Sequence, residues 1–183
     1  MSERNTLAHA LHDLGLAAWF GGSLMGAIGV NGAAADVDDP RQRARVANAG
    51  WARWTPFNAV AIGAHLVGGA QLLKANKGRV ATQQGVLANT NLKMALTAGA
   101  LAATGYARVL GKKMQKAGDV PVAGGTNATT GTPPEVAKAQ KQLSALQWAV
   151  PALTGGLVVI TSYAGEQQRA SEVHQGFLDR FLA

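Results

Sequence analysis

Residues 14–35 read LGLAAWFGGSLMGAIGVNGAAA, and these 22 positions carry no formal charge. The hydrocarbon core of a bilayer is about 30 Å thick, and about 20 helical residues cross it at about 1.5 Å per residue. The stretch therefore predicts a membrane-spanning helix over residues 14–34.

Three further segments have a similar length and composition. Residues 54–73 and 142–165 carry no formal charge, and residues 86–107 contain a single cation, Lys93. Basic or mixed-charge connections separate the four segments. We expect one all-α domain over residues 1–183, an integral membrane four-helix bundle with amphipathic terminal helices. A soluble alanine-rich bundle is the alternative. Scales for the free energy of inserting side chains into a membrane favour the membrane-spanning interpretation.

Composition excludes several classes of function. The net charge is +7, but the Lys and Arg residues flank apolar segments and form no basic stripe with interleaved aromatic residues, so we expect lipid contact and no nucleic acid. The absence of cysteine excludes disulfides, thiolate metal sites and thiol nucleophiles. The four segments contain no Asp or Glu, which argues against a cation-coupled transporter.

The distribution of positive charge predicts an orientation. The first and third connections together hold ten Lys and Arg residues, and the opposite side holds seven. Cytoplasmic loops carry the excess of positive charge, so both termini are expected outside the cytoplasm. No cleavable signal peptide is evident, and the Ala/Gly-rich, Arg-bearing composition suits a bacterium. The expected location is therefore a bacterial plasma membrane, crossed several times.

The polar stretches between and after the four apolar segments also predict local structure. Asp39 followed by Pro40 is typical of a helix N-cap and first turn, and predicts a short amphipathic helix over residues 40–48. The Gly-, Thr- and Pro-rich residues 117–134 predict a flexible linker. Residues 166–183 have an apolar helical stripe and predict an amphipathic tail on the membrane surface or on a partner.

Small residues recur at every fourth position of the first three segments. Such rows let membrane helices approach closely. They indicate either a seam between copies or with a larger membrane complex, or tight packing within one chain, and the second interpretation is favoured. The positions are Ala18, Gly22, Gly26, Ala64, Gly68, Ala95, Gly99 and Ala103.

His65 lies near the middle of the second segment, where an ionisable side chain is a functional candidate. It is interpreted first as a neutral histidine hydrogen-bonded across the bundle, then as a proton relay or ligand contact, and third as a haem ligand. Haem would need a second histidine at similar depth, and His12 is expected about 12 Å nearer the surface. Lys93 either snorkels to the interface or faces the interior. The expected hydrogen-bond partners of His65 are Thr97, Thr104, Thr154 and Gln147.

His9, His12 and Asp13 share one helical face at i, i+3 and i+4. Their donor atoms are types that zinc or copper accepts. The competing interpretation is a polar face at the membrane interface, with Asp13 near the start of a span.

Residues 9–22, HALHDLGLAAWFGG, resemble the first span of small four-helix bacterial membrane proteins. These include the group similar to eukaryotic transmembrane protein 205 and the copper-resistance D family, which begin with a His and then Trp-x-Gly on span one. Resemblance to the copper family implicates His12 in metal handling. The chain lacks that larger family's further spans, and it has no cysteine and no Met-rich motif.

No catalytic motif is present: Gly-x-Ser-x-Gly, His-Glu-x-x-His and paired intramembrane carboxylates are all missing. The leading hypothesis is therefore a non-enzymatic accessory or scaffold subunit that packs with itself or with a larger membrane complex. The alternative is a protein that handles a small molecule, a metal or protons at His65. A haem-binding membrane subunit is third.

Overall fold

The computed structural model describes residues 5–166, which are mostly helical with one small two-stranded sheet. In chain order the elements are α1 (Thr6–Met25), the π-helix η1 (Gly26–Val30), α2 (Asn31–Ala35), α3 (Pro40–Ala75), α4 (Lys77–Thr82), α5 (Gln84–Lys116), β1 (Val122–Gly124), β2 (Asn127–Ala128) and α6 (Pro134–Glu166).

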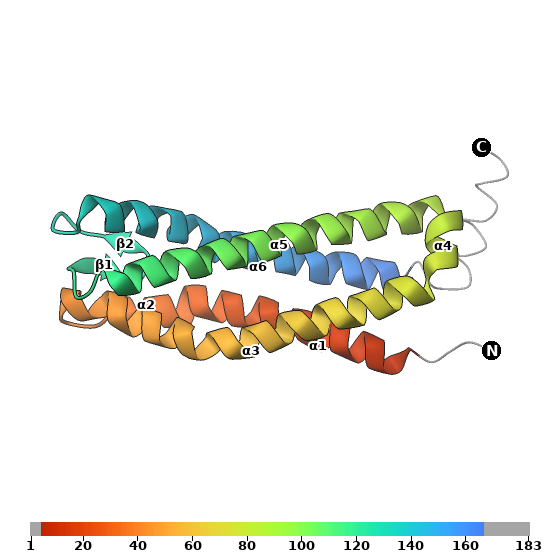
Figure 1. Ribbon diagram of the computed structural model, residues 1–183, viewed down its shortest axis with the longest axis horizontal. Helices are drawn as coiled ribbons and strands as arrows, with labels where there is room; N and C mark the ends of the chain where they lie inside the picture. The colour runs from red at the N-terminus through yellow and green to blue at the C-terminus, as the bar shows by residue number, and fades with distance from the viewer. Residues whose placement is uncertain (1–4, 167–183) are drawn as a thin grey trace.

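Four long rods lie side by side and run alternately up and down (Figure 1). The first rod is continuous through α1, η1 and α2, and it covers 30 residues. It packs against α3 and α6, and α5 packs against α6, whereas α3 and α5 touch each other little. The short helix α4 closes one end, and the sheet lies at the other (Figure 1).

Each of the four predicted segments lies within a different rod. Two helical stretches, Thr6–Ala35 and Pro134–Tyr163, are long and apolar enough to cross a membrane. The predicted tail lies outside the described residues, apart from Glu166 at the end of α6.

The start of α3 confirms the predicted cap. The Asp39 carboxylate accepts the backbone N–H of Arg41 at 3.0 Å, and Pro40 occupies the first helical position. This hydrogen bond lowers the pKa of Asp39. The short helix expected over residues 40–48 is instead the first part of the 36-residue α3, because no break in the backbone separates it from the apolar segment.

The predicted linker over residues 117–134 is folded in the structure. Val122 pairs with Ala128 in the small antiparallel sheet and is completely buried. The side-chain amide of Gln140 on α6 donates to the carbonyl of Gly124 at 2.9 Å. Composition did not reveal this outcome, because one apolar side chain and one amide from another helix are enough to anchor a Gly- and Thr-rich loop.

Most of the small-residue positions make contacts within the chain. A Cβ added at Gly22 would meet the Trp54 ring, and one at Gly26 would meet the Trp51 ring. A Cβ at Gly68 would lie 2.5 Å from the Ala8 carbonyl oxygen on α1.

On the α1 side of the same α1–α3 contact, a Cβ at Gly15 would collide with the Ala61 carbonyl oxygen of α3. Glycine therefore lets the backbones of α1 and α3 meet directly. On α5, Gly99 is in ordinary contact distance of Leu153 on α6, whereas Ala95 is exposed.

Candidate functional site

Two buried histidines meet where α1 crosses α3. The ring centroids of His12 and His65 are 4.4 Å apart, and the rings are tilted by 38°. The side chains reach each other because Gly15 and Gly68 remove the side-chain bulk on either side of the crossing. The exposed fractions of His12 and His65 are 7% and 3%.

Hydrogen bonds fix the same tautomer on both rings. His65 Nδ1 donates to the backbone carbonyl of His12 at 3.2 Å, and His12 Nδ1 donates to the Asp13 carboxylate at 2.8 Å. A carbonyl and a carboxylate only accept, so each Nδ1 carries a proton. In the neutral rings, both Nε2 atoms are then hydrogen-bond acceptors.

Trp19 completes this packing. Its ring is completely buried and meets His65 edge-on, with centroids 6.2 Å apart. Its indole N–H donates to the Thr104 hydroxyl on α5 at 3.2 Å. Trp19 therefore joins the histidine pair to α5.

A cavity of about 540 Å³ lies beside the histidine pair. Lys93 of α5 lines it and is half-buried, and within residues 5–166 it forms no ion pair. Asp13 lines the same cavity as Lys93 and His65. The polar lining comprises His9, His12, Asp13, His65, Asn76, Arg79, Asn89, Thr90, Lys93, Thr97 and Thr161.

The expected hydrogen-bond partners of His65 were wrong. Thr104 accepts from Trp19, Gln147 accepts from Asn31, and Thr154 donates to the carbonyls of Val150 and Pro151 in its own helix, while the ring of His65 binds the His12 carbonyl. Thr97 lines the same cavity but does not bind the ring.

The expected 12 Å difference in depth between His12 and His65 was also wrong. Helix α1 begins at Thr6, eight residues before the uncharged stretch, so His12 lies within the bundle. The direct ring contact leaves no space for a macrocycle between the two imidazoles.

The expected metal-binding face is only partly assembled. His9 is exposed, His12 is buried, and Asp13 is already hydrogen-bonded to His12. Among the described residues, no group of three or more His, Asp or Glu side chains is arranged to hold a metal ion.

The sequence suggested a site centred on His65 with Lys93 or His12 assisting, and the structure places all three residues around one cavity. Sequence reasoning missed Trp19 and Gly15, whose signal was their spacing from His12, at seven and three residues along one helix. A second cavity, of about 240 Å³, lies toward the sheet end between α3 and α5 and was not expected.

No protein-family model, curated protein or solved structure matches this chain.

Proposed function

We propose that this chain is a non-enzymatic, multi-pass protein of a bacterial plasma membrane that binds a small polar molecule in the histidine cavity. The observation that carries the proposal is the His12–His65 pair, buried beside a 540 Å³ cavity that Lys93 also lines. Ionisable groups within an apolar bundle are costly, and this cost favours a functional role.

The surface of the four rods supports a membrane setting. Each rod exposes large apolar side chains, and the most apolar windows of the two candidate spans are only 33% and 22% buried within the protein. The core helix of a soluble protein would be mostly buried instead. One example from each rod is Leu14 at 72% exposure, Phe57 at 69%, Val109 at 62% and Val159 at 66%.

The cavity chemistry indicates the kind of ligand. A volume of about 540 Å³ suits a small molecule. The Nε2 atoms of the neutral imidazoles and the Asp13 carboxylate in the same lining favour a ligand that donates hydrogen bonds, and the Lys93 ammonium favours an acidic group on the same molecule. The proposed ligand therefore carries both a donor and an anionic group, as small amino or hydroxy acids do.

Native mass spectrometry on protein extracted gently from its own membranes tests the proposal. The wild-type 18.8 kDa chain is expected to carry an extra mass of up to a few hundred daltons. Lys93→Met and His65→Gln are expected to lose it, whereas Lys74→Met, which removes an exposed lysine of α3 outside the cavity, keeps it.

An unliganded wild-type chain, with the three variants indistinguishable from it, would contradict ligand binding. In that case, proton exchange at the histidine pair would be tested next, by following the two imidazoles in an NMR titration.

The accessory-subunit hypothesis is a second candidate. Its specific support is Ala95, a small residue exposed on α5, and Gly63 on α3, where an added Cβ would meet nothing within 4 Å. Such faces accept a closely packed helix from another chain. An excess mass equal to a whole protein in the same experiment would favour this candidate.

A further inference from the structure

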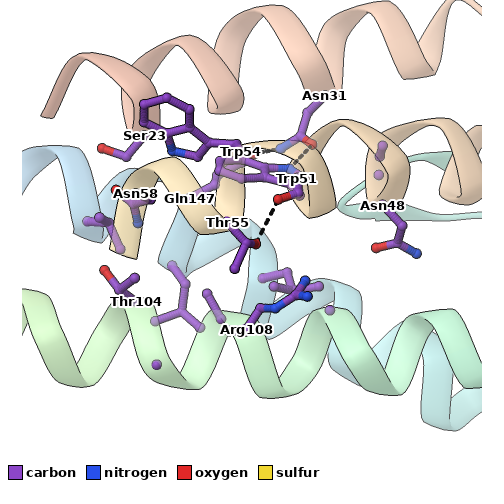
Figure 2. Close-up of a pocket in the computed structure, with 18 of the residues that line it drawn as sticks. Ser23, Asn31, Asn48, Trp51, Trp54, Thr55, Asn58, Thr104, Arg108 and Gln147 are labelled. Atoms are coloured by element: carbon purple, nitrogen blue, oxygen red, sulfur yellow. Dashed lines mark hydrogen bonds between the residues drawn. The ribbon is translucent and has the colours of Figure 1, made fainter. Parts of the chain in front are cut away.

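The second cavity has a mixed lining of aromatic and polar groups. Trp51 and Trp54 of α3 lie on one side, and Arg108 of α5 lies on the opposite side (Figure 2). The volume is about 240 Å³, too small for a large cofactor but sufficient for a headgroup or a short amphiphile.

One wall of this cavity is held rigidly. Asn31 donates to Gln147 on α6 at 2.7 Å and accepts the indole N–H of Trp51 at 3.0 Å (Figure 2). Thr55 donates to the Trp51 backbone carbonyl at 2.8 Å. The Trp51 ring therefore has a fixed position before any ligand arrives, which lowers the entropic cost of binding.

Other polar groups of the cavity have no partner within the described residues. The indole N–H of Trp54 and the side-chain oxygen of Asn58 are buried without a hydrogen bond. Buried polar atoms are normally paired, so an unpaired donor beside an unpaired acceptor points to a ligand that supplies both partners.

Arg108 is also without a partner in the part of the chain that the structure describes. Its guanidinium forms no hydrogen bond or ion pair there. Among the described residues no carboxylate lies within 4.0 Å of Arg108: Asp119 at this end of the bundle lies 4.0 Å from Arg45, and Glu135 lies 3.6 Å from Lys113. An arginine without a carboxylate, facing an aromatic wall, is suited to a phosphate or carboxylate group.

We infer that this second cavity binds an amphipathic molecule with a phosphate or carboxylate group, which Arg108 and the Trp54 indole N–H hold while the apolar part lies against Trp51. The end of the bundle that contains Arg108 holds ten Lys and Arg residues against five Asp and Glu residues, and this excess of positive charge attracts anionic amphiphiles. The site is separate from the histidine cavity and does not depend on its function.

The test uses the full chain in dodecyl maltoside with dodecyl phosphate as the probe and native mass spectrometry as the readout. One dodecyl phosphate is expected to bind per chain. Loss of a charge-assisted contact in Arg108→Gln is expected to weaken binding by about tenfold or more. Arg53→Gln removes an exposed arginine of α3 outside the cavity with the same change in net charge, and is expected to bind within about twofold of wild type.

A second variant keeps the inference testable if Arg108→Gln does not fold. Trp54→Phe keeps an aromatic ring but lacks the N–H, and is expected to weaken binding by about threefold to tenfold. Equal affinity in wild type and Arg108→Gln, with both chains melting at the same temperature, would overturn the inference. Inorganic phosphate that binds as tightly as dodecyl phosphate would overturn the amphipathic assignment.

A final experiment identifies the source of the ligand. In phosphatidylcholine nanodiscs that contain some phosphatidylglycerol, retention of phosphatidylglycerol by wild type and its loss from Arg108→Gln would assign the site to a membrane lipid. Binding of dodecyl phosphate without retention of phosphatidylglycerol would assign it to a smaller anionic amphiphile. Both results support the site.

Discussion

Gly68→Ala tests the direct backbone contact between α1 and α3, on which the histidine pair depends. The added Cβ would lie 2.5 Å from the Ala8 carbonyl oxygen, 2.5 Å from the His12 nitrogen and 2.9 Å from the His12 Cα. Ordinary contact for a Cβ begins near 3.4 Å. All three obstacles are backbone atoms, so no side-chain rotation relieves the clash and the two helices must separate.

The expected change in the free energy of unfolding follows from two opposing effects. Overpacking of this kind costs about 1–3 kcal/mol, and the upper half of that range applies when backbone must move. The better helix propensity of alanine offsets about 1 kcal/mol. We therefore expect Gly68→Ala to lower the free energy of unfolding by about 1–2 kcal/mol.

Gly63→Ala is the matched control on the same helix, because an added Cβ there meets nothing within 4 Å. Gly63→Ala gains only the higher helix propensity of alanine over glycine and is expected to be more stable than wild type by about 1 kcal/mol. For a domain of this size the two variants should then differ in melting temperature by about 5–10 °C.

Thermal unfolding followed by far-UV circular dichroism in one detergent measures the difference. A Gly68→Ala chain that melts at or above the temperature of Gly63→Ala would refute the close approach of α1 and α3. The assigned contact between the two histidine rings would then lose its physical basis.

Three further changes probe other parts of the structure. Asp39→Ala is expected to lower the melting temperature at neutral pH. The hydrogen bond lowers the pKa of Asp39 below 3.8, so its stabilisation is present above that pH and is lost as the pH falls through the lowered pKa. Wild type and variant should therefore melt at the same temperature in strong acid. A difference that persists in acid would show that the carboxylate is not responsible. Gln140→Ala leaves the Gly124 carbonyl without its donor and is expected to cost about 1–3 kcal/mol and to speed hydrogen exchange in residues 122–128; unchanged exchange would argue against this anchor. Asn31→Ala removes two partly buried hydrogen bonds and is expected to cost about 2 kcal/mol in denaturant unfolding, with a shift in tryptophan fluorescence; an unaltered spectrum would contradict the fixed position of Trp51.

The sequence predicted the helical framework well, because charge-free runs and caps are local signals. The four segments fall in four separate rods, and the Asp39–Pro40 pair starts α3 as expected. The expected N-terminal helix is present from Thr6, and the structure joins it without a break to the first apolar segment in α1.

The candidate site was harder to predict because it depends on contacts between distant residues. His12 and His65 are 53 positions apart, and their meeting depends on two glycines that allow one particular crossing of α1 and α3. A single sequence does not say which small-residue row meets which helix. The hairpin was missed for a related reason, since its anchor Gln140 lies on another element.

The π-helix η1 also affects how this chain tolerates changes in length. The backbone N–H of Asn31 bonds to the Gly26 carbonyl five residues earlier, so η1 accommodates one residue more than an α-helical turn would. Deleting Ile28, which is 60% exposed, would convert this turn to a regular α-helix while Asn31 still faced Trp51. The same deletion within α1 would rotate one flank of the helix relative to the other by about 100° and turn either the histidine or the asparagine away from its partner. Natural deletions in relatives of this protein should therefore concentrate at residues 26–30, between Ser23 and Asn31, which both line the second cavity.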